Sequence, residues 1–111
     1  MKIENTKAQM RKGILEYCIL SEIEKGDAYA SDIIAALKRN KMLVVEGTLY
    51  PLLTRLKNAN LLTYRWEESN SGPPRKYYAL TKKGEMFKEE LATTWIELYT
   101  AVNSIIKTKE S

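Results

Sequence analysis

The segment 46–57 restricts the fold of this chain more than any other, because it combines a helical apolar pattern with an internal proline. Its sequence is EGTLYPLLTRLK. At ~100° per residue, four leucines fall within one arc of the helical wheel, namely Leu49, Leu52, Leu53 and Leu56. The other arc carries Gly47, Thr48, Pro51, Thr54, Arg55 and Asn58. The segment therefore predicts a short helix that packs its leucines inward and exposes a polar, partly basic face.

Proline removes one backbone donor and is tolerated best in the first turn of a helix. Pro51 therefore predicts that this helix begins close to Gly47. Asn60 lies just past the expected end, and asparagine is among the few non-glycine residues that readily adopt a positive φ. We expect the chain to reverse direction there.

Two strand-like runs follow and predict a β-hairpin. Apolar and polar side chains alternate along 62–67, as in a half-buried strand. The inward residues of that strand are expected to be Leu62, Tyr64 and Trp66. The Pro/Gly-rich segment 71–74 is expected to be the turn, and 75–80 the second strand. An amphipathic helix followed by a hairpin with a basic tip is typical of a winged helix-turn-helix, which points to DNA.

Three further helices and one short strand complete the expected fold, whose class is α+β and mostly α. Apolar residues at three- and four-residue spacing predict helices over 6–24 and 30–40. Gly26 is suited to a left-handed cap after the first helix, and Ser31 and Asp32 favour the first turn of the second. The run 42–45 is β-branched and too short for a helix, so it is expected to form a third strand at the hairpin edge.

A long helix is expected from the cap residue Thr81 to Lys107, and its apolar stripe is the expected dimer interface. The members of the stripe are Phe87, Leu91, Trp95, Leu98, Val102 and Ile105. A body of ~80 residues is too small to cover a stripe of this length alone. Accordingly we divide the chain into a winged-helix DNA-binding domain, 1–80, and a C-terminal dimerisation helix, 81–111.

Composition excludes several other classes of protein. The chain has 111 residues, a formal net charge of +4 and no histidine, so the commonest general base and metal ligand is missing. We therefore expect neither an enzyme nor a metal or cofactor. Cys18 is alone and lies on an apolar stripe, which favours a buried thiol over a redox sensor. No run is apolar enough to span a bilayer, so we expect a cytoplasmic protein without a membrane partner.

The order helix, helix, strand, helix, hairpin and long helix closely resembles the PadR family of bacterial transcriptional regulators. The resemblance is carried by 47–53, Arg55, Leu56, Leu61, 74–78 and 80–84. It implies a homodimeric repressor that binds an inverted-repeat operator in double-stranded DNA, with the last helix reaching across to the partner subunit. Because one helix follows the wing, the chain resembles the short subfamily without a large effector domain.

Trp95 narrows the resemblance to the multidrug-binding PadR-like repressors, in which one indole from each subunit sandwiches a planar aromatic drug at the dimer centre. The ligand-binding residues implied here are Met10, Ile14, Tyr17, Leu91, Trp95 and Tyr99. This chain has Tyr99 where the drug binder has an acidic residue, and Tyr17 in place of a smaller side chain. Both changes narrow the implied pore and weaken the case for binding cations. Dimer packing without a ligand is the alternative interpretation of Trp95.

The candidate DNA-contacting residues lie on the expected recognition helix, on the second helix and at the hairpin tip. They are Tyr29, Ser31, Thr48, Tyr50, Thr54, Arg55, Lys57, Arg75 and Lys76. Hydroxyl and arginine side chains suit base edges and phosphates in the major groove, and basic residues in a wing suit phosphates or the minor groove.

A winged-helix protein–protein adaptor without DNA binding is the alternative function, and a small enzyme is a remote third. Placement of Arg55, Arg75 and Lys76 on one side argues against the adaptor. An interaction that is insensitive to salt would argue for it, because phosphate contacts are salt-dependent.

Overall fold

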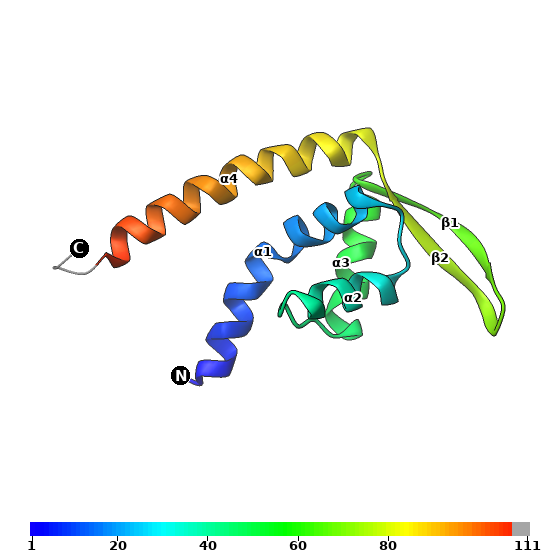
Figure 1. Ribbon diagram of the computed structural model, residues 1–111, viewed down its shortest axis with the longest axis horizontal. Helices are drawn as coiled ribbons and strands as arrows, with labels where there is room; N and C mark the ends of the chain where they lie inside the picture. Colours follow the sequence, from blue (N-terminus) through cyan, green and yellow to red (C-terminus); the bar gives the residue numbers. More distant parts are fainter. Residues whose placement is uncertain (108–111) are drawn as a thin grey trace.

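Four helices and one hairpin form the fold in the computed structural model, which describes residues 1–107. The elements are α1 (Ile3–Lys25), α2 (Ala30–Arg39), α3 (Glu46–Asn58), β1 (Leu62–Ser69), β2 (Gly72–Leu80) and α4 (Lys82–Ile106). In Figure 1, α2 and α3 lie between α1 and the hairpin, which projects from one side, while α4 runs away from the hairpin past α1. This arrangement confirms the expected winged helix with a long C-terminal helix. Within residues 1–107, none of the helices has the length and apolar character that a membrane-spanning segment requires.

The core forms where the apolar faces of α1, α2 and α3 meet the base of the hairpin. All four leucines of the α3 stripe are buried, as their spacing predicts, and Leu49 and Leu53 are fully inaccessible. Burial of one such side chain contributes about 1.5–3 kcal/mol. The other fully buried large side chains are Ile19, Leu20, Ile23, Ile33 and Leu62.

Cys18 is half-buried against this core rather than fully buried. Its burial, with a smaller contribution from the carboxylate of Glu22, raises the pKa of the thiol. The protonated thiol is therefore favoured, and it packs as a small apolar group.

The ends of α1 and α2 differ in detail from the expected helices. The first helix begins at Ile3, three residues earlier than its apolar pattern indicates. Gly26 has φ 169°, which is extended and not left-handed, because the chain continues from it towards the edge of β2. Positive φ occurs instead at Lys41 and Asn60, both at 64°. The prediction for Asn60 is thus confirmed, and the prediction for Gly26 is wrong.

The prediction of a third strand over 42–45 is wrong, since this segment is irregular and the sheet of the described residues has two strands. Ala28 takes the free edge of β2 instead. Its N–H donates to the carbonyl of Tyr78 at 3.0 Å, and the Tyr78 N–H donates back at 2.8 Å. The segment 42–45 begins by closing α2, because the N–H of Met42 donates to the Leu37 carbonyl at 2.8 Å.

The helix α3 begins at Glu46, which confirms the predicted start close to Gly47, but Pro51 then lies in its second turn and not in the first. The proline deprives the Gly47 carbonyl of its donor four residues on and crowds that carbonyl. Gly47 and Pro51 are both exposed, so water can satisfy the carbonyl and the cost is confined to one hydrogen bond. The helix therefore continues through the proline.

The hairpin is longer and its turn tighter than the sequence indicates. The antiparallel pairing aligns Trp66 with Lys76 and Ser69 with Gly72, so Pro73 and Pro74 belong to β2 and not to the turn. Trp66 was expected to face inward, yet it is 62% exposed. Alternation along β1 does place its side chain on the face of the sheet that packs on the helices, but the hairpin extends beyond the helices there.

A close joint fixes the start of α4. As predicted, Thr81 caps the helix, since its Oγ1 accepts the N–H of Gly84 at 2.9 Å. A Cβ on Gly84 would overlap the carbonyl oxygen of Leu61 and lie 2.8 Å from Leu80 Cδ1. Lys83 Nζ also donates to the carbonyl of Ala59, just past α3, at 3.0 Å. The backbone between α3 and β1 thus sits directly against the first turn of α4.

Candidate nucleic-acid interface

The exposed surface of α3 has two flanks beside the buried leucine stripe. Tyr50 and Lys57 lie on the flank towards the hairpin, whereas Thr48 and Arg55 lie on the flank towards α1. Thr54 is exposed between the two flanks. Five candidate DNA-contacting residues are therefore accessible on one helix, but they do not form one continuous row.

Arg55 is not a free cation, because its guanidinium forms an ion pair with Glu16 of α1. Among the described residues, this is the ion pair that joins α1 to α3. The Glu16 side chain is 25% exposed, so its carboxylate depends on Arg55 more than a surface carboxylate would. The sequence gives no sign of this pair, because the two residues are on different helices.

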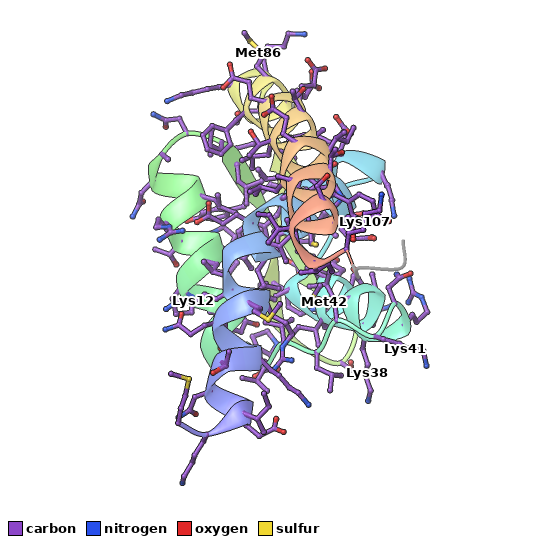
Figure 2. The ribbon with its side chains drawn as sticks, turned by 90° about the vertical axis from the view of Figure 1, so that its left-hand side faces the viewer. Lys12, Lys38, Lys41, Met42, Met86 and Lys107 are labelled. Atoms are coloured by element: carbon purple, nitrogen blue, oxygen red, sulfur yellow. The ribbon has the colours of Figure 1, made fainter. Side chains whose placement is uncertain are left out.

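A groove of about 650 Å3 separates the N-terminal half of α1 from the start of α3. Its rim is basic, with Arg11, Lys12 and Arg55, while Leu15 and Leu52 contribute to its apolar floor. Lys12 lies on the side of α1 that faces α3 (Figure 2). The groove adds positive charge to the α1 flank of the recognition helix.

Arg75 and Lys76 point to opposite faces of the hairpin, as consecutive residues of a strand must. The register places Lys76 beside Trp66, and Arg75 beside Glu67. The expectation that Arg55, Arg75 and Lys76 lie on one side is therefore wrong. We call the face that packs on the helices the inner face, with Tyr64, Trp66, Lys76 and Tyr78, and the other the outer face, with Arg65, Glu67, Arg75 and Tyr77.

On the outer face, Arg75 reaches the start of α2. Its guanidinium carbon lies 4.0 Å from the ring centroid of Tyr29, and its Nη1 donates to Ser31 Oγ at 3.4 Å. Tyr29 in turn packs edge-on against Tyr77, with ring centroids 4.7 Å apart. Three of the candidate residues, from two separate elements, thus form one exposed cluster.

Asp32, and not Ser31, closes the N-terminus of α2. The backbone N–H of Tyr29 donates to Asp32 Oδ2 at 3.1 Å. The hydroxyl of Ser31 is used by Arg75 instead. Both residues were expected in the first turn of α2 and lie there, but Asp32 caps the helix whereas Ser31 binds Arg75.

Arg65 pairs with Glu67 on the first arm of the wing and with Asp27. Its Nε donates to Glu67 at 2.8 Å and its Nη1 to Asp27 at 2.9 Å, while the guanidinium lies over the ring of Tyr77 at 4.5 Å. Its hydrogen bonds to Asp27 and then to Glu67 raise the pKa of Arg65 further. Glu67 therefore does not leave a free negative charge beside the basic residues of the wing.

The inner face carries a cluster in which two lysines that were expected to contact DNA meet two aromatic residues that were not expected to be part of the site. The Nζ atoms of Lys57 and Lys76 lie 5.9 Å and 4.6 Å from the ring centroid of Tyr64. Lys76 Nζ also lies 5.6 Å from the ring of Trp66, which packs edge-on against Tyr64 at 6.0 Å. The alternation of aromatic residues along β1 was the available signal, but it was interpreted only as a core pattern.

Tyr78 lies between this cluster and the core, and it is buried. Its burial, followed by the proximity of Tyr50 and Tyr64, raises the pKa of its phenol. The phenol therefore stays neutral, and Tyr78 anchors the base of the inner face.

The candidate dimer and ligand residues of α4 remain largely accessible in the single chain. The exposed fractions are 38% for Phe87, 42% for Trp95, 53% for Leu98, 48% for Val102 and 80% for Ile105, whereas Leu91 is half-buried. The rings of Trp95 and Tyr99 are 5.7 Å apart and tilted by 60°. On α1, Met10 is exposed, and Ile14 and Tyr17 are half-buried.

No metal centre is evident in the part of the chain that the structure describes, where no three acidic, histidine or cysteine side chains are grouped as a metal ion requires. The interface is thus made of arginine, lysine, aromatic and hydroxyl groups, which suit phosphate and sugar more than they suit a metal.

Comparisons with known proteins match the whole fold. The model of the transcriptional regulator PadR-like family matches residues 19–90. A PadR-like transcription factor from Bacteroides fragilis is 63% identical, with a TM-score of 0.76 over 91% of this chain and 98% of that one. A PadR-like transcriptional regulator from Bacillus cereus is 36% identical (TM-score 0.79, 91% and 99% of the two chains). One from Eggerthella lenta is 30% identical (TM-score 0.82, 97% and 91%).

Proposed function

The chain belongs to the PadR-like family of transcriptional regulators, and from this premise we propose that it is a repressor that binds an inverted repeat in double-stranded DNA as a homodimer. The observation that carries the proposal is the cluster of Arg75, Tyr29 and Ser31, which joins the wing to the start of α2. Figure 1 shows that the hairpin tip and the N-terminal end of α3 lie at the same end of the molecule. A duplex at that end can contact both.

Each part of the surface has a separate role in this proposal. The exposed face of α3 enters the major groove, where Thr48, Tyr50 and Thr54 face base edges or phosphates. The cluster of Arg75, Tyr29 and Ser31 holds the sugar–phosphate backbone and sets the register without specifying sequence.

The dimer is proposed to form through α4. Apolar residues that project from this helix are exposed over several turns, beyond the point where Leu91 packs on the core. A second copy of the helix, related by two-fold symmetry, covers such a stripe with an identical one. Residues 1–80 then form the DNA-binding unit, and 81–111 the dimerisation segment.

Fluorescence anisotropy of a labelled duplex tests the proposal. The duplex is first selected by the protein from a random-sequence pool and is then compared with an unselected duplex of the same length. We expect tighter binding to the selected duplex, and an affinity that falls steeply as salt rises because phosphate contacts release counterions. Binding that neither prefers the selected duplex nor responds to salt would support the protein–protein adaptor instead.

Replacing Arg55 with alanine is expected to weaken binding of the selected duplex by ~1–3 kcal/mol, and of random duplex by less, if the guanidinium reaches a base edge. Arg55→Ala alone strands the carboxylate of Glu16, so it is compared with Arg55→Ala combined with Glu16→Gln. Thermal melts show whether both variants fold. Equal losses on both duplexes would assign Arg55 to the backbone, and no loss would leave it as a link between α1 and α3.

We further propose that a planar aromatic molecule binds between the two Trp95 side chains at the dimer centre and releases DNA. The exposed pair of Trp95 and Tyr99 supports this, because paired aromatic faces stack on flat guests. Micromolar affinity is expected for neutral planar compounds, since Tyr99 brings no negative charge. For the ligand to release DNA, it must favour a dimer in which the separation of the two recognition helices does not match one DNA turn of ~34 Å.

Titration with a panel of planar dyes tests the ligand site. Quenching of tryptophan emission is expected in the parent protein and in a Trp66→Phe variant, but not in a Trp95→Ala variant. Equal quenching in the two variants, or none in the parent, would assign Trp95 to dimer packing alone.

A further inference from the structure

The inner face of the wing presents a large apolar side chain that nothing in the single chain covers. Trp66 is 62% exposed, although it lies in the middle of a strand. Its neighbours are the ring of Tyr64 and the ammonium group of Lys76. An exposed indole beside a cation, outside the apolar stripe of α4, is not explained by the core or by the proposed dimer interface.

Two ammonium groups from different elements are held over one ring in the same cluster. Lys57 comes from α3 and Lys76 from β2, and both Nζ atoms lie within 6 Å of the Tyr64 centroid. Cation–π attraction holds each of them, but the two positive charges repel one another. Among the described residues, no ion pair is formed by either lysine, so each ammonium group is available to an anion.

The position of the cluster indicates which anion would bind there. The cluster bridges the hairpin-facing flank of α3 and the wing, on the side where the hairpin extends beyond the helices. With α3 in the major groove and the wing tip at the next minor groove, one strand of the duplex backbone passes between them. That strand offers phosphates to the ammonium groups and deoxyribose to an aromatic face.

We propose that this inner face is a DNA-backbone site in which Lys57 and Lys76 hold backbone phosphates and the Trp66 indole packs against an adjoining deoxyribose. The inference rests on the proposed function, and it adds a contact that the outer-face cluster of Arg75 does not make. The indole N–H can donate to a phosphate oxygen. Tyr64 acts as a positioning residue, since its ring sets the places of both lysines and of Trp66.

The fluorescence of Trp66 itself can report the contact with DNA, and the test uses this signal. Unlabelled random-sequence duplex is titrated into the parent, into Trp95→Phe and into Trp66→Phe, while anisotropy of the labelled duplex measures binding in parallel. Tryptophan emission is expected to change as the duplex saturates in the parent and in Trp95→Phe, but not in Trp66→Phe. Binding seen by anisotropy with no change in Trp66 emission would overturn the backbone site and leave the proposed function standing. No binding by anisotropy would overturn both.

Affinities of substituted proteins give a second, independent readout. Trp66→Ala is expected to weaken binding to the random and to the selected duplex by the same factor. We expect this factor to be about tenfold, the effect of losing one anchoring side chain. Lys76→Gln should lower the slope of log affinity against log salt by about one. Lys82→Gln is the matched control, because Lys82 is an 83% exposed lysine at the start of α4, and it should leave the slope unchanged.

Two outcomes of these measurements would contradict the site. A Trp66→Ala loss confined to the selected duplex would mean that the indole reads sequence and does not pack on the backbone. Equal competition by a single strand of the same length would mean that the indole stacks on bases. Tyr64→Leu should reproduce the slope change of Lys76→Gln, whereas Tyr64→Leu with an unchanged slope would remove the positioning role of the tyrosine.

Discussion

Replacing Gly84 with alanine is expected to lower the free energy of unfolding by about 3 kcal/mol, close to the largest cost that overpacking usually imposes. The added Cβ would overlap the carbonyl oxygen of Leu61 and approach the Leu80 side chain to 2.8 Å. A backbone carbonyl cannot move aside as the tip of a side chain can. The whole first turn of α4 would therefore have to shift away from the hairpin. Urea denaturation, followed by circular dichroism, measures the loss.

Gly13→Ala provides a matched control for this effect. Gly13 lies inside α1, and a Cβ there would meet no atom within 4 Å. Alanine in a helix interior is favoured over glycine by about 1 kcal/mol, so this variant should become more stable. If Gly84→Ala is as stable as Gly13→Ala, the close contact between α4 and the carbonyl of Leu61 does not exist in solution.

The double substitution of Leu98 and Val102 with glutamate is expected to convert the proposed dimer into a monomer and to weaken selected-duplex binding by more than about 100-fold. These side chains are 53% and 48% exposed in the single chain, so the substitution should spare its fold. In a two-fold interface it places four carboxylates against apolar neighbours, where burial of unpaired charge costs several kcal/mol. Loss of the dimer removes one of the two half-site contacts.

Sedimentation at micromolar concentration should give twice 12.8 kDa for the parent and 12.8 kDa for the variant. Thr100→Glu combined with Ser104→Glu adds the same charge to the opposite side of α4, at exposed positions, and should remain dimeric. A parent that sediments as a monomer, or a Leu98/Val102 variant that stays dimeric, would rule out this interface.

Most of the fold could be predicted from local patterns in the sequence. The leucine spacing of α3 placed the buried stripe correctly, and the cap at Thr81 and the positive φ of Asn60 followed from residue chemistry alone. These features depend on neighbours within about four residues along the chain, which a sequence displays directly.

The errors came from competition between distant segments. The run 42–45 has the composition of a strand, but Ala28 occupies the available edge of β2. Trp66 follows the correct alternation, yet its exposure depends on where the helices end beneath the hairpin. Neither outcome is encoded within the segment itself, because each is decided by a partner far away in the chain.

The candidate interface shows the same division. Residue types indicated which side chains suit DNA, but not that Arg55 pairs with Glu16 or that Arg75 joins Tyr29 and Ser31. The opposite facing of Arg75 and Lys76 could have been predicted from strand alternation, because both residues were expected in the second strand, 75–80, but the alternation was not applied to them.

The joint at Gly84 makes α4 a lever arm. The helix has 25 residues and is therefore about 37 Å long. Near its start it is braced by the Thr81 cap, by Lys83 on the Ala59 carbonyl and by Lys88, whose Nζ lies 2.7 Å from Glu24 of α1, and Leu91 packs on the core further along. A tilt of about 5° at that fulcrum swings the far end by about 3 Å. In the proposed dimer, the torsional stiffness of a joint that admits no Cβ thus governs how precisely the two recognition helices hold their separation along the duplex.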